Sequence, residues 1–347
     1  MRSCLILILI FLNFSSIRSE CPLESLLEPC ACVLAIPSHT YLIANDYSPE
    51  TIIEQQRSIV CENIDDDSFD LESIFIRLSS ISDENQTAFD SFLLSNTSVE
   101  QIAKNVFHNI TFTCLMFQDN RRLTTIDRDA FTSINKYVEI FETLNTNLSN
   151  SDEIFSILRP FENLRRLSMH NDRWTRIPPY AFNQTKLSQI WFGLENQRSS
   201  QSIESIGAYA FYHLTSLRVL RIFSPSLTTI DRYAFAQRSR STNNQTLTIL
   251  LGGSNINSTS FPVTSLTRFR NRRVDLRFYF TTLTFFDEDV FQPFLEANPQ
   301  SSIELHRTNL FFRCDCRSAW IQLDYQGENR VIGYPCWSND FSHCSPK

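Results

Sequence analysis

Cysteine is the residue type whose spacing predicts the most definite chemistry in this chain of 347 residues. Setting Cys4 aside, most of the cysteines gather near the two ends, at Cys21, Cys30, Cys32, Cys61, Cys314, Cys316, Cys336 and Cys344. In a protein of an oxidising compartment, this distribution predicts two disulfide-bonded terminal modules. Zinc is the alternative for the Cys-x-Cys pairs, but no histidine pattern lies nearby to complete a zinc site. The spacing does not decide which cysteines pair.

Cys114 lies between these two groups, in the segment Phe112-Thr-Cys-Leu-Met-Phe117. Two strand registers are open there, one pointing its side chain inward and the other placing it on the opposite face of a sheet. A buried thiol is the expected state. An intermolecular disulfide is the alternative, and it would create a covalent dimer or heteromer.

Motifs for catalysis or metal binding do not occur in the sequence. The six histidines are scattered without an H-E-x-x-H pattern, and the glycine motifs of phosphate, dinucleotide and serine-nucleophile sites are missing. We therefore predict a protein that is not an enzyme and that uses no cofactor or metal. An extracellular hydrolase is the enzyme alternative.

The first 19 residues predict a secretory signal peptide. Arg2 supplies the positive charge, Cys4 to Phe14 is apolar, and Ser16 to Ser19 offers small residues for cleavage. The apolar run is shorter than the ~20 residues that span a bilayer, so we expect a secreted, extracellular protein without a membrane anchor. Seven sequons agree with that compartment and predict N-glycosylation at Asn85, Asn96, Asn109, Asn147, Asn183, Asn244 and Asn257.

The charge distribution limits the kinds of partner. A formal net charge of −7 argues against general binding of nucleic acid. The stretch from Arg268 to Arg277 is a local exception, with five arginines. Its expected role is that of a solvated loop, and binding of a glycan such as heparin is the alternative.

A recurring unit organises the residues between the two cysteine groups. Its clearest copy, Leu217 to Phe235, begins with alternating apolar residues, as in a short strand, and returns to bury one Ile and one Phe. The return part recurs with the same spacing at Ile102/Phe107, Ile126/Phe131, Ile177/Phe182, Ile206/Phe211, Ile230/Phe235, Ile256/Phe261 and Phe286/Phe291. Phe161 is the expected equivalent in one degenerate unit. Because one unit cannot bury its apolar edge alone, the units must stack on one another.

The strand parts predict about ten strands, spaced ~23–30 residues apart, each with two inward side chains. The expected inward pairs are Phe92/Leu94, Leu115/Phe117, Val138/Ile140, Leu167/Met169, Ile190/Phe192, Leu220/Ile222, Leu250/Gly252, Leu276/Phe278 and Ile303/Leu305. We also expect an earlier strand within Ile74 to Leu78.

These units resemble leucine-rich repeats, whose pattern is L-x-x-L-x-L-x-x-N-x-L followed by a return segment, and Leu164-Arg-Arg-Leu167-Ser-Met169 fits it well. The cysteine groups resemble the N- and C-terminal caps of secreted proteins of that family. The resemblance implies an α/β solenoid, or horseshoe, with a parallel sheet on its concave face and an irregular or short helical convex side. It also implies the disulfides Cys21–Cys32, Cys30–Cys61, Cys314–Cys336 and Cys316–Cys344.

The expected boundaries are 1–19 for the signal peptide, 20–62 for the N-terminal cap, 63–312 for the repeats and 313–347 for the C-terminal cap. The pattern Cys-Pro…Pro-Cys-x-Cys before a Phe-anchored array is also similar to the non-catalytic leucine-rich subunit of the shrimp Oplophorus luciferase and its arthropod relatives. That narrower resemblance implies an accessory subunit that stabilises a secreted enzyme.

The side chains between the inward pairs are the candidates for binding, because successive strand residues point to opposite faces. The residues selected for the concave face are Arg166, Ser168, His170, Gln189, Trp191, Gly193, Val219, Arg221, Phe223, Asp275, Arg277 and Tyr279. Aromatic rings beside arginine are typical of interface hot spots, although a register slip of one residue would turn these side chains inward. We predict that the face binds an extracellular or cell-surface protein, or a secreted enzyme as partner subunit.

Overall fold

The computed structural model describes residues 21–34, 57–80, 87–194, 202–238, 245–269, 272–306, 312–325, 328, 330–337, 339, 341 and 344. These residues belong to two compact units, which are described separately. The first unit comprises residues 1–148 and 160–165, and the second comprises 149–159 and 166–347. The predicted signal peptide and the sequon asparagines Asn85 and Asn244 lie outside the described residues.

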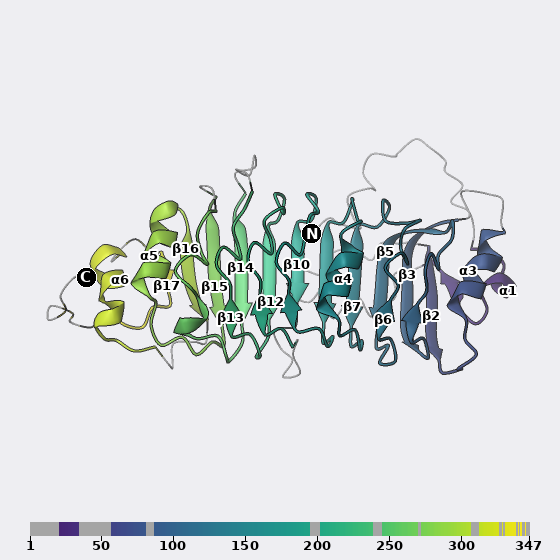
Figure 1. The fold of residues 1–347 in the computed structure, drawn as a ribbon, viewed down its shortest axis with the longest axis horizontal. Helices are drawn as coiled ribbons and strands as arrows, with labels where there is room; N and C mark the ends of the chain where they lie inside the picture. Colours follow the sequence, from purple (N-terminus) through teal and green to yellow (C-terminus); the bar gives the residue numbers. More distant parts are fainter. Residues whose placement is uncertain are drawn as a thin grey trace. The chain divides into compact units, whose positions relative to one another are not determined.

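The first unit pairs its strands in sequence order (Figure 1). Its sheet runs through β1 (Ala31–Val33), β2 (Ser58–Ile64), β3 (Ala88–Thr97), β5 (Thr111–Gln118) and β7 (Ile140–Leu144). The β1–β2 pair is antiparallel and the following pairs are parallel. The return side holds the short parallel pair of β4 (Gln101–Ile102) and β6 (Thr125–Ile126), and the helices are α1 (Glu24–Leu27) and α3 (Leu71–Ser79).

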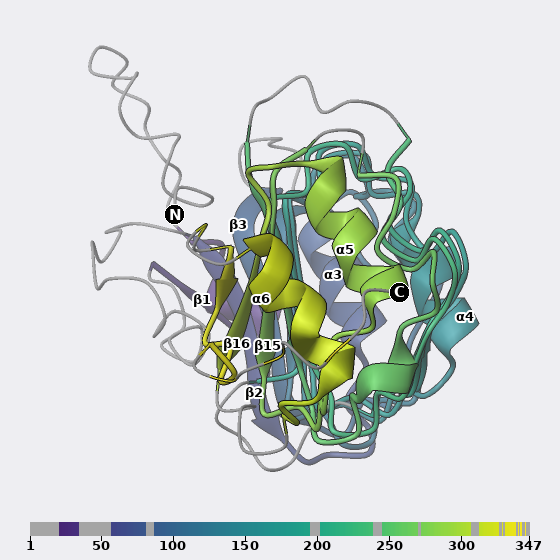
Figure 2. The same cartoon turned by 90° about the vertical axis from the view of Figure 1, so that its left-hand side faces the viewer.

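The second unit repeats this arrangement with parallel pairs. Its strands are β8 (Arg166–His170), β10 (Gln189–Phe192), β12 (Val219–Phe223), β14 (Leu247–Gly252), β15 (Val274–Tyr279), β16 (Ser302–His306) and β17 (Val331–Ile332). The returns contain β9 (Arg176–Ile177), β11 (Ser205–Ile206), β13 (Thr229–Ile230), α4 (Ser151–Leu158), η3 (Ser258–Ser260) and α5 (Glu288–Ala297), and η4 (Cys316–Ser318) and α6 (Ala319–Tyr325) follow β16. Within this unit, Figure 2 shows β15 and β16 on one side and α4 on the other. The predicted solenoid of parallel strands and irregular returns is confirmed.

The predicted return anchors form the core between the sheet and the return side. Every Ile and Phe of the seven spaced pairs is buried. The rings of successive repeats stack on one another. The centroid of the Phe211 ring lies 5.6 Å from that of Phe182 and 5.8 Å from that of Phe235. Phe161 is buried against Phe131 and Phe141, so it anchors the degenerate unit as predicted. This stacking accounts for the high phenylalanine content of the chain.

Three details of the predicted strands are wrong. Ile74 to Leu78 lies in helix α3, which buries Leu71, Ile74, Phe75 and Leu78 on one face and is capped by Asp70. In β7 the inward residues are Phe141 and Thr143 and not Val138/Ile140, because they align with Leu115 and Phe117. In β14 they are Ile249 and Leu251 and not Leu250/Gly252. The other predicted inward pairs are buried as expected.

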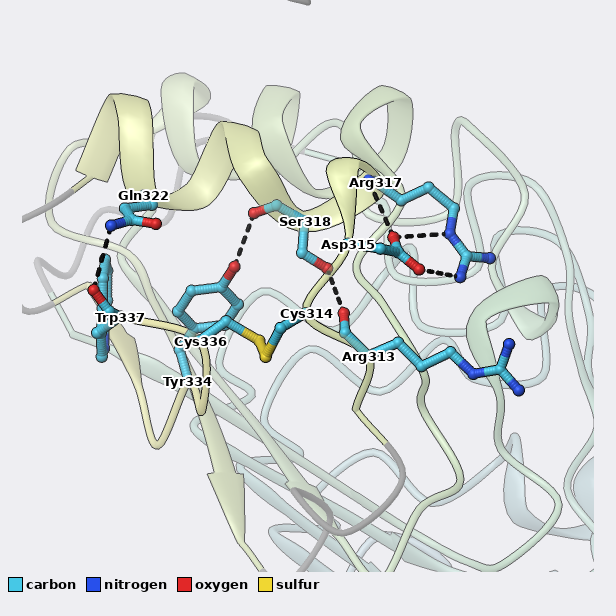
Figure 3. Close-up of a disulfide and its surroundings, with 9 residues drawn as sticks. All are labelled: Arg313, Cys314, Asp315, Arg317, Ser318, Gln322, Tyr334, Cys336 and Trp337. Atoms are coloured by element: carbon cyan, nitrogen blue, oxygen red, sulfur yellow. Dashed lines mark hydrogen bonds and ion pairs between the residues drawn. A yellow bond between two sulfur atoms is a disulfide. The ribbon is translucent and has the colours of Figure 1, made fainter. Parts of the chain in front are cut away.

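Four disulfides join the cysteines near the two ends of the chain. They link Cys21 to Cys32, Cys30 to Cys61, Cys314 to Cys336 and Cys316 to Cys344, the pairs that the resemblance to capped repeats implies. Figure 3 shows the surroundings of the Cys314–Cys336 bond, where the Tyr334 hydroxyl donates to the Ser318 carbonyl oxygen over 2.8 Å. Nearby, the Arg317 side chain donates to Asp315 over 3.0 Å.

Cys114 is buried on the face of β5 that points away from the return side, level with Ser91 and Ile140. It packs in a small apolar cluster with Leu93, Met116 and Ile140. This position favours a buried thiol over a disulfide between molecules, because a partner cysteine would have to displace those side chains.

Candidate functional site

The outward face of the second sheet carries the candidate binding residues. On β8, β10, β12 and β15 the predicted inward pairs are all buried, so the side chains between them point to the opposite face. The pairing aligns Trp191 with Ser168 on one neighbouring strand and with Arg221 on the other. The predicted register is therefore correct for these strands, and the candidates are brought together on one surface.

An arginine–tryptophan cluster, made of Arg166, Trp191 and Arg221, occupies one end of this surface. The guanidinium carbons of Arg166 and Arg221 lie 4.1 and 5.3 Å from the centroid of the Trp191 ring. Such cation–π contacts stabilise by about 0.5–2 kcal/mol each, depending on their exposure. They hold the partly exposed indole in place before any partner arrives, which lowers the entropy cost of binding.

A row of three rings, Phe223, Tyr279 and His306, lies farther along the same face. The ring of Phe223 crosses β14 and packs edge-on against Tyr279 at 5.7 Å. Gly252 permits the crossing, because a Cβ atom there would lie 2.3 Å from Cδ1 of Phe223. Tyr279 then stacks on His306 at 4.4 Å.

Contacts with Glu304 position the polar side chains around this row. Arg277 forms an ion pair with Glu304, with 3.1 Å between Nε and one carboxylate oxygen, and His306 lies 2.8 Å from the other oxygen. Glu304 and His306 were not among the predicted candidates, although the alternation around Ile303 and Leu305 places both on the outward face. Gly252 was also missed, since it was assigned to the inward face.

Four predicted contact residues are too buried for direct contact with a partner. Ser168 and His170 are 0% and 1% exposed, Phe223 is 6% exposed beside the ring of Tyr279, and Gly193 is buried as well. The other eight predicted residues retain partial exposure: Arg166, Gln189, Trp191, Val219, Arg221, Asp275, Arg277 and Tyr279. The surface open to a partner therefore consists of these eight residues, together with Glu304 and His306.

Burial lowers the pKa of His170 from 6.5 to about 4, and the charge of Arg166 adds to the effect. The unfolded chain therefore takes up this proton as the pH falls below about 6.5, whereas the folded chain resists until about pH 4. We expect His170 to reduce the free energy of unfolding by about 3 kcal/mol between pH 7.5 and pH 4. Urea unfolding at both pH values checks this. The His170→Gln variant should lose that part of the pH dependence, and equal pH dependence in both proteins would contradict the assignment.

The arginines between Arg268 and Arg277 do not form one basic surface. Arg273 bonds to Asp275 over 3.2 Å and Arg277 pairs with Glu304, both on the outward face. Arg272 is buried, and it lines a cavity together with Arg268. Arg270 lies outside the described residues. Because these arginines are either paired with carboxylates or placed at different sites, they do not favour a continuous heparin-binding stretch.

The part of the chain that the structure describes offers no group of three or more His, Cys, Asp or Glu side chains placed to hold a metal ion. Within the same residues, the helices are too short or too polar to cross a bilayer.

The stacked strand-and-return units define a leucine-rich repeat protein. The sequence matches the family model of the BspA type leucine-rich repeat region, with six copies over residues 84–197 and 175–277, and the chain belongs to this family. Among solved structures, it is similar to human 5T4, also described as Wnt-activated inhibitory factor 1 or trophoblast glycoprotein. The two are 13% identical, the match covers 94% of this chain and 100% of that chain, and the TM-score is 0.42. A search of curated proteins gave no match.

Leucine-rich repeats generally build surfaces for protein interaction and are generally not catalytic. The four disulfides also indicate an oxidising, extracellular compartment.

Proposed function

We propose that the protein is secreted and glycosylated, and that it binds an extracellular protein through the outward face of the second sheet. The observation that carries this proposal is the indole of Trp191, held between the guanidinium groups of Arg166 and Arg221. Large rings and arginines on a rigid strand supply much contact energy for little lost entropy. The parallel sheet of a leucine-rich repeat, which is the concave face in this family, is the usual place for such a site.

The composition of this face further supports a protein as the partner. Tyr279, His306 and Arg277, which is paired with Glu304, add rings and a partly exposed charge farther along the same face. None of the predicted glycosylation sites lies on β8, β10, β12, β14 or β15, so no predicted glycan is attached to these strands. In this proposal residues 20–62 and 313–347 cap the two ends of the repeats and shield their apolar edges.

The substitution Trp191→Ala is expected to weaken partner binding at least tenfold, because a hot-spot tryptophan contributes about 2 kcal/mol or more. The partner is first captured from extracellular fluid on the immobilised, glycosylated protein and identified by mass spectrometry. Its affinity for the variants is then measured by surface plasmon resonance.

The matched control is Tyr137→Ala, which removes an exposed ring from the first unit. Its affinity for the captured partner should equal that of the unaltered protein, and circular dichroism should show both variants folded. Equal affinity of a folded Trp191→Ala protein would exclude this face as the binding site.

A secreted enzyme is the second candidate for the partner. Its support is the Cys-Pro…Pro-Cys-x-Cys pattern of the N-terminal cysteine group and the Phe-anchored repeats, which are similar to an accessory luciferase subunit. In that role the repeats would stabilise the enzyme and take no part in its chemistry. Capture of a secreted enzyme, whose thermal inactivation slows when this protein is added, distinguishes an accessory subunit from a receptor-binding protein.

A further inference from the structure

We propose that the cavity beside Arg268 and Arg272, on the second unit, binds a small oxyanion such as sulfate. The cavity has a volume of about 380 Å³ and lies against the end of α5. Its lining includes the two arginines, the rings of Phe269 and Phe294, and Ser301, and none of the described residues that line it is an aspartate or glutamate. None of these lining residues belongs to the proposed partner-binding face.

Arg272 is a buried cation whose hydrogen-bond partners are all neutral. Its Nε donates to the Gln245 carbonyl oxygen over 3.0 Å, Nη1 donates to Gln237 Oε1 over 3.1 Å, and Nη2 donates to the Leu217 carbonyl oxygen. These bonds use three of the five N–H groups of a guanidinium. Burial, and then the charge of Arg218, lower the pKa of Arg272 to about 10, so the group stays charged at neutral pH. A buried charge surrounded only by neutral acceptors is stabilised by an opposite charge placed beside it.

The side-chain amide of Gln237, which accepts a hydrogen bond from Arg272, has an N–H donor without a partner among the described residues. Gln237 is 2% exposed, and this donor is its Nε2. Its backbone N–H donates to the Arg268 carbonyl oxygen over 3.2 Å, so Gln237 connects the two arginines of the cavity. Buried amide groups without partners are rare in native proteins, and a bound ligand or water is the usual explanation.

Arg268 is held at the rim of the cavity. Its guanidinium carbon lies 4.3 Å from the centroid of the Tyr233 ring, and Nη1 lies 3.4 Å from the Tyr209 hydroxyl. The backbone of Arg268 is left-handed, with a φ of 66°, which is uncommon for a residue with a long side chain. These contacts hold the guanidinium of Arg268 at the cavity that Arg272 also lines.

The end of α5 is the feature that opposes an anion, because a helix C-terminus carries partial negative charge. Arg330 counters it by donating to the carbonyl oxygens of Ser301 and Asn298, each over 3.1 Å. The apolar walls of Phe269 and Phe294 lower the local dielectric constant, which strengthens the attraction of the two arginines for an oxyanion. The balance of charges at the cavity is therefore positive.

The test is isothermal titration of the full secreted protein with sodium sulfate, with chloride used to hold the ionic strength constant. One saturable site is expected, and Arg268→Gln should weaken sulfate binding about tenfold, as for loss of one charge-assisted hydrogen bond. Arg268 is the residue to change because Arg272 also ties three segments of the fold together. The control is Arg173→Gln, which removes an exposed arginine of the same unit and should leave sulfate affinity unchanged.

A heparin tetrasaccharide forms the second arm of the experiment. If it displaces sulfate and also loses affinity in Arg268→Gln, the oxyanion is the sulfate group of a glycan. If it does not compete, the oxyanion is a free ion. Absence of saturable sulfate binding, or equal effects of Arg268→Gln and Arg173→Gln, would overturn the proposal. Partner binding to the outward face should be the same in both variants, so failure of one proposal leaves the other standing.

Discussion

Replacing Phe211 with alanine is expected to lower the free energy of unfolding by about 3–5 kcal/mol. Phe211 is 1% exposed and stacks on Phe182 and Phe235, one ring on each side. The substitution removes both stacking contacts and leaves a cavity that the rigid neighbouring returns cannot fill. Urea unfolding, monitored by circular dichroism, measures the change.

The control for this prediction is Leu323→Ala, because Leu323 is an apolar residue of the same unit that is 62% exposed. Removing an exposed side chain should change the free energy of unfolding by no more than about 0.5 kcal/mol. A Phe211→Ala protein that unfolds at the same urea concentration as Leu323→Ala would show that the phenylalanine stack does not hold the returns together.

Removing the Cys30–Cys61 disulfide, by changing both residues to alanine, is expected to cost about 3–4 kcal/mol. The bond closes a sequence separation of 31 residues, so its loss frees the unfolded chain and raises its entropy. Cys61 also lies buried within β2, where the bond ties the sheet to the segment before it. Thermal and urea unfolding of the double variant measure the loss.

The Cys21–Cys32 disulfide provides the comparison, because it closes a separation of only 11 residues. Changing this pair to alanine should cost about 1 kcal/mol less than removing Cys30–Cys61, since the shorter loop restricts the unfolded chain less. Equal losses, or the reverse order, would argue that strain or packing, and not loop length, determines what these bonds contribute.

The repeat architecture could be predicted from the sequence because its signal is carried by spacing. In every return pair the second apolar residue lies five residues after the first, and all of these residues are buried. The inward residues could also be predicted where apolar and polar side chains alternate cleanly, as in Leu220-Arg-Ile222. Alternation determines which face a side chain occupies, so Trp191 and Arg221 could be placed on the outward face as well.

The wrong assignments lie in segments where apolar and polar residues do not alternate, so the sequence does not show which side chains point inward. In Ile249-Leu250-Leu251 every residue is apolar, so either register fits, and only the pairing with β12 decides between them. The spacing Leu71, Ile74, Phe75 and Leu78 is the pattern of a helix face, and Asp70 before it is a capping residue. The sequence therefore carries a helix signal here, but the apolar run Ile74-Phe-Ile also fits a strand.

The finer features of the surface depend on contacts that pair distant residues. Nothing in the sequence around Gly252 indicates that the ring of Phe223 crosses it, since the two are brought together by strand pairing. Arg272 and Gln237 are likewise distant in sequence and meet only because the returns stack. The basic stretch looked uniform as a sequence, whereas folding buries one of its arginines and pairs two others with carboxylates.

The position of the Phe223 ring also affects how the second unit unfolds. In a stack where each coil contacts only the coils beside it, unfolding can proceed one coil at a time. Here the contact between Phe223 and Tyr279 skips the strand between them and joins β12 directly to β15. This is a next-nearest-neighbour coupling, and the bond from Arg272 to the Leu217 carbonyl oxygen is another. The ring contact makes the three strands a single cooperative segment, so that part of the proposed binding face opens as a unit or stays closed.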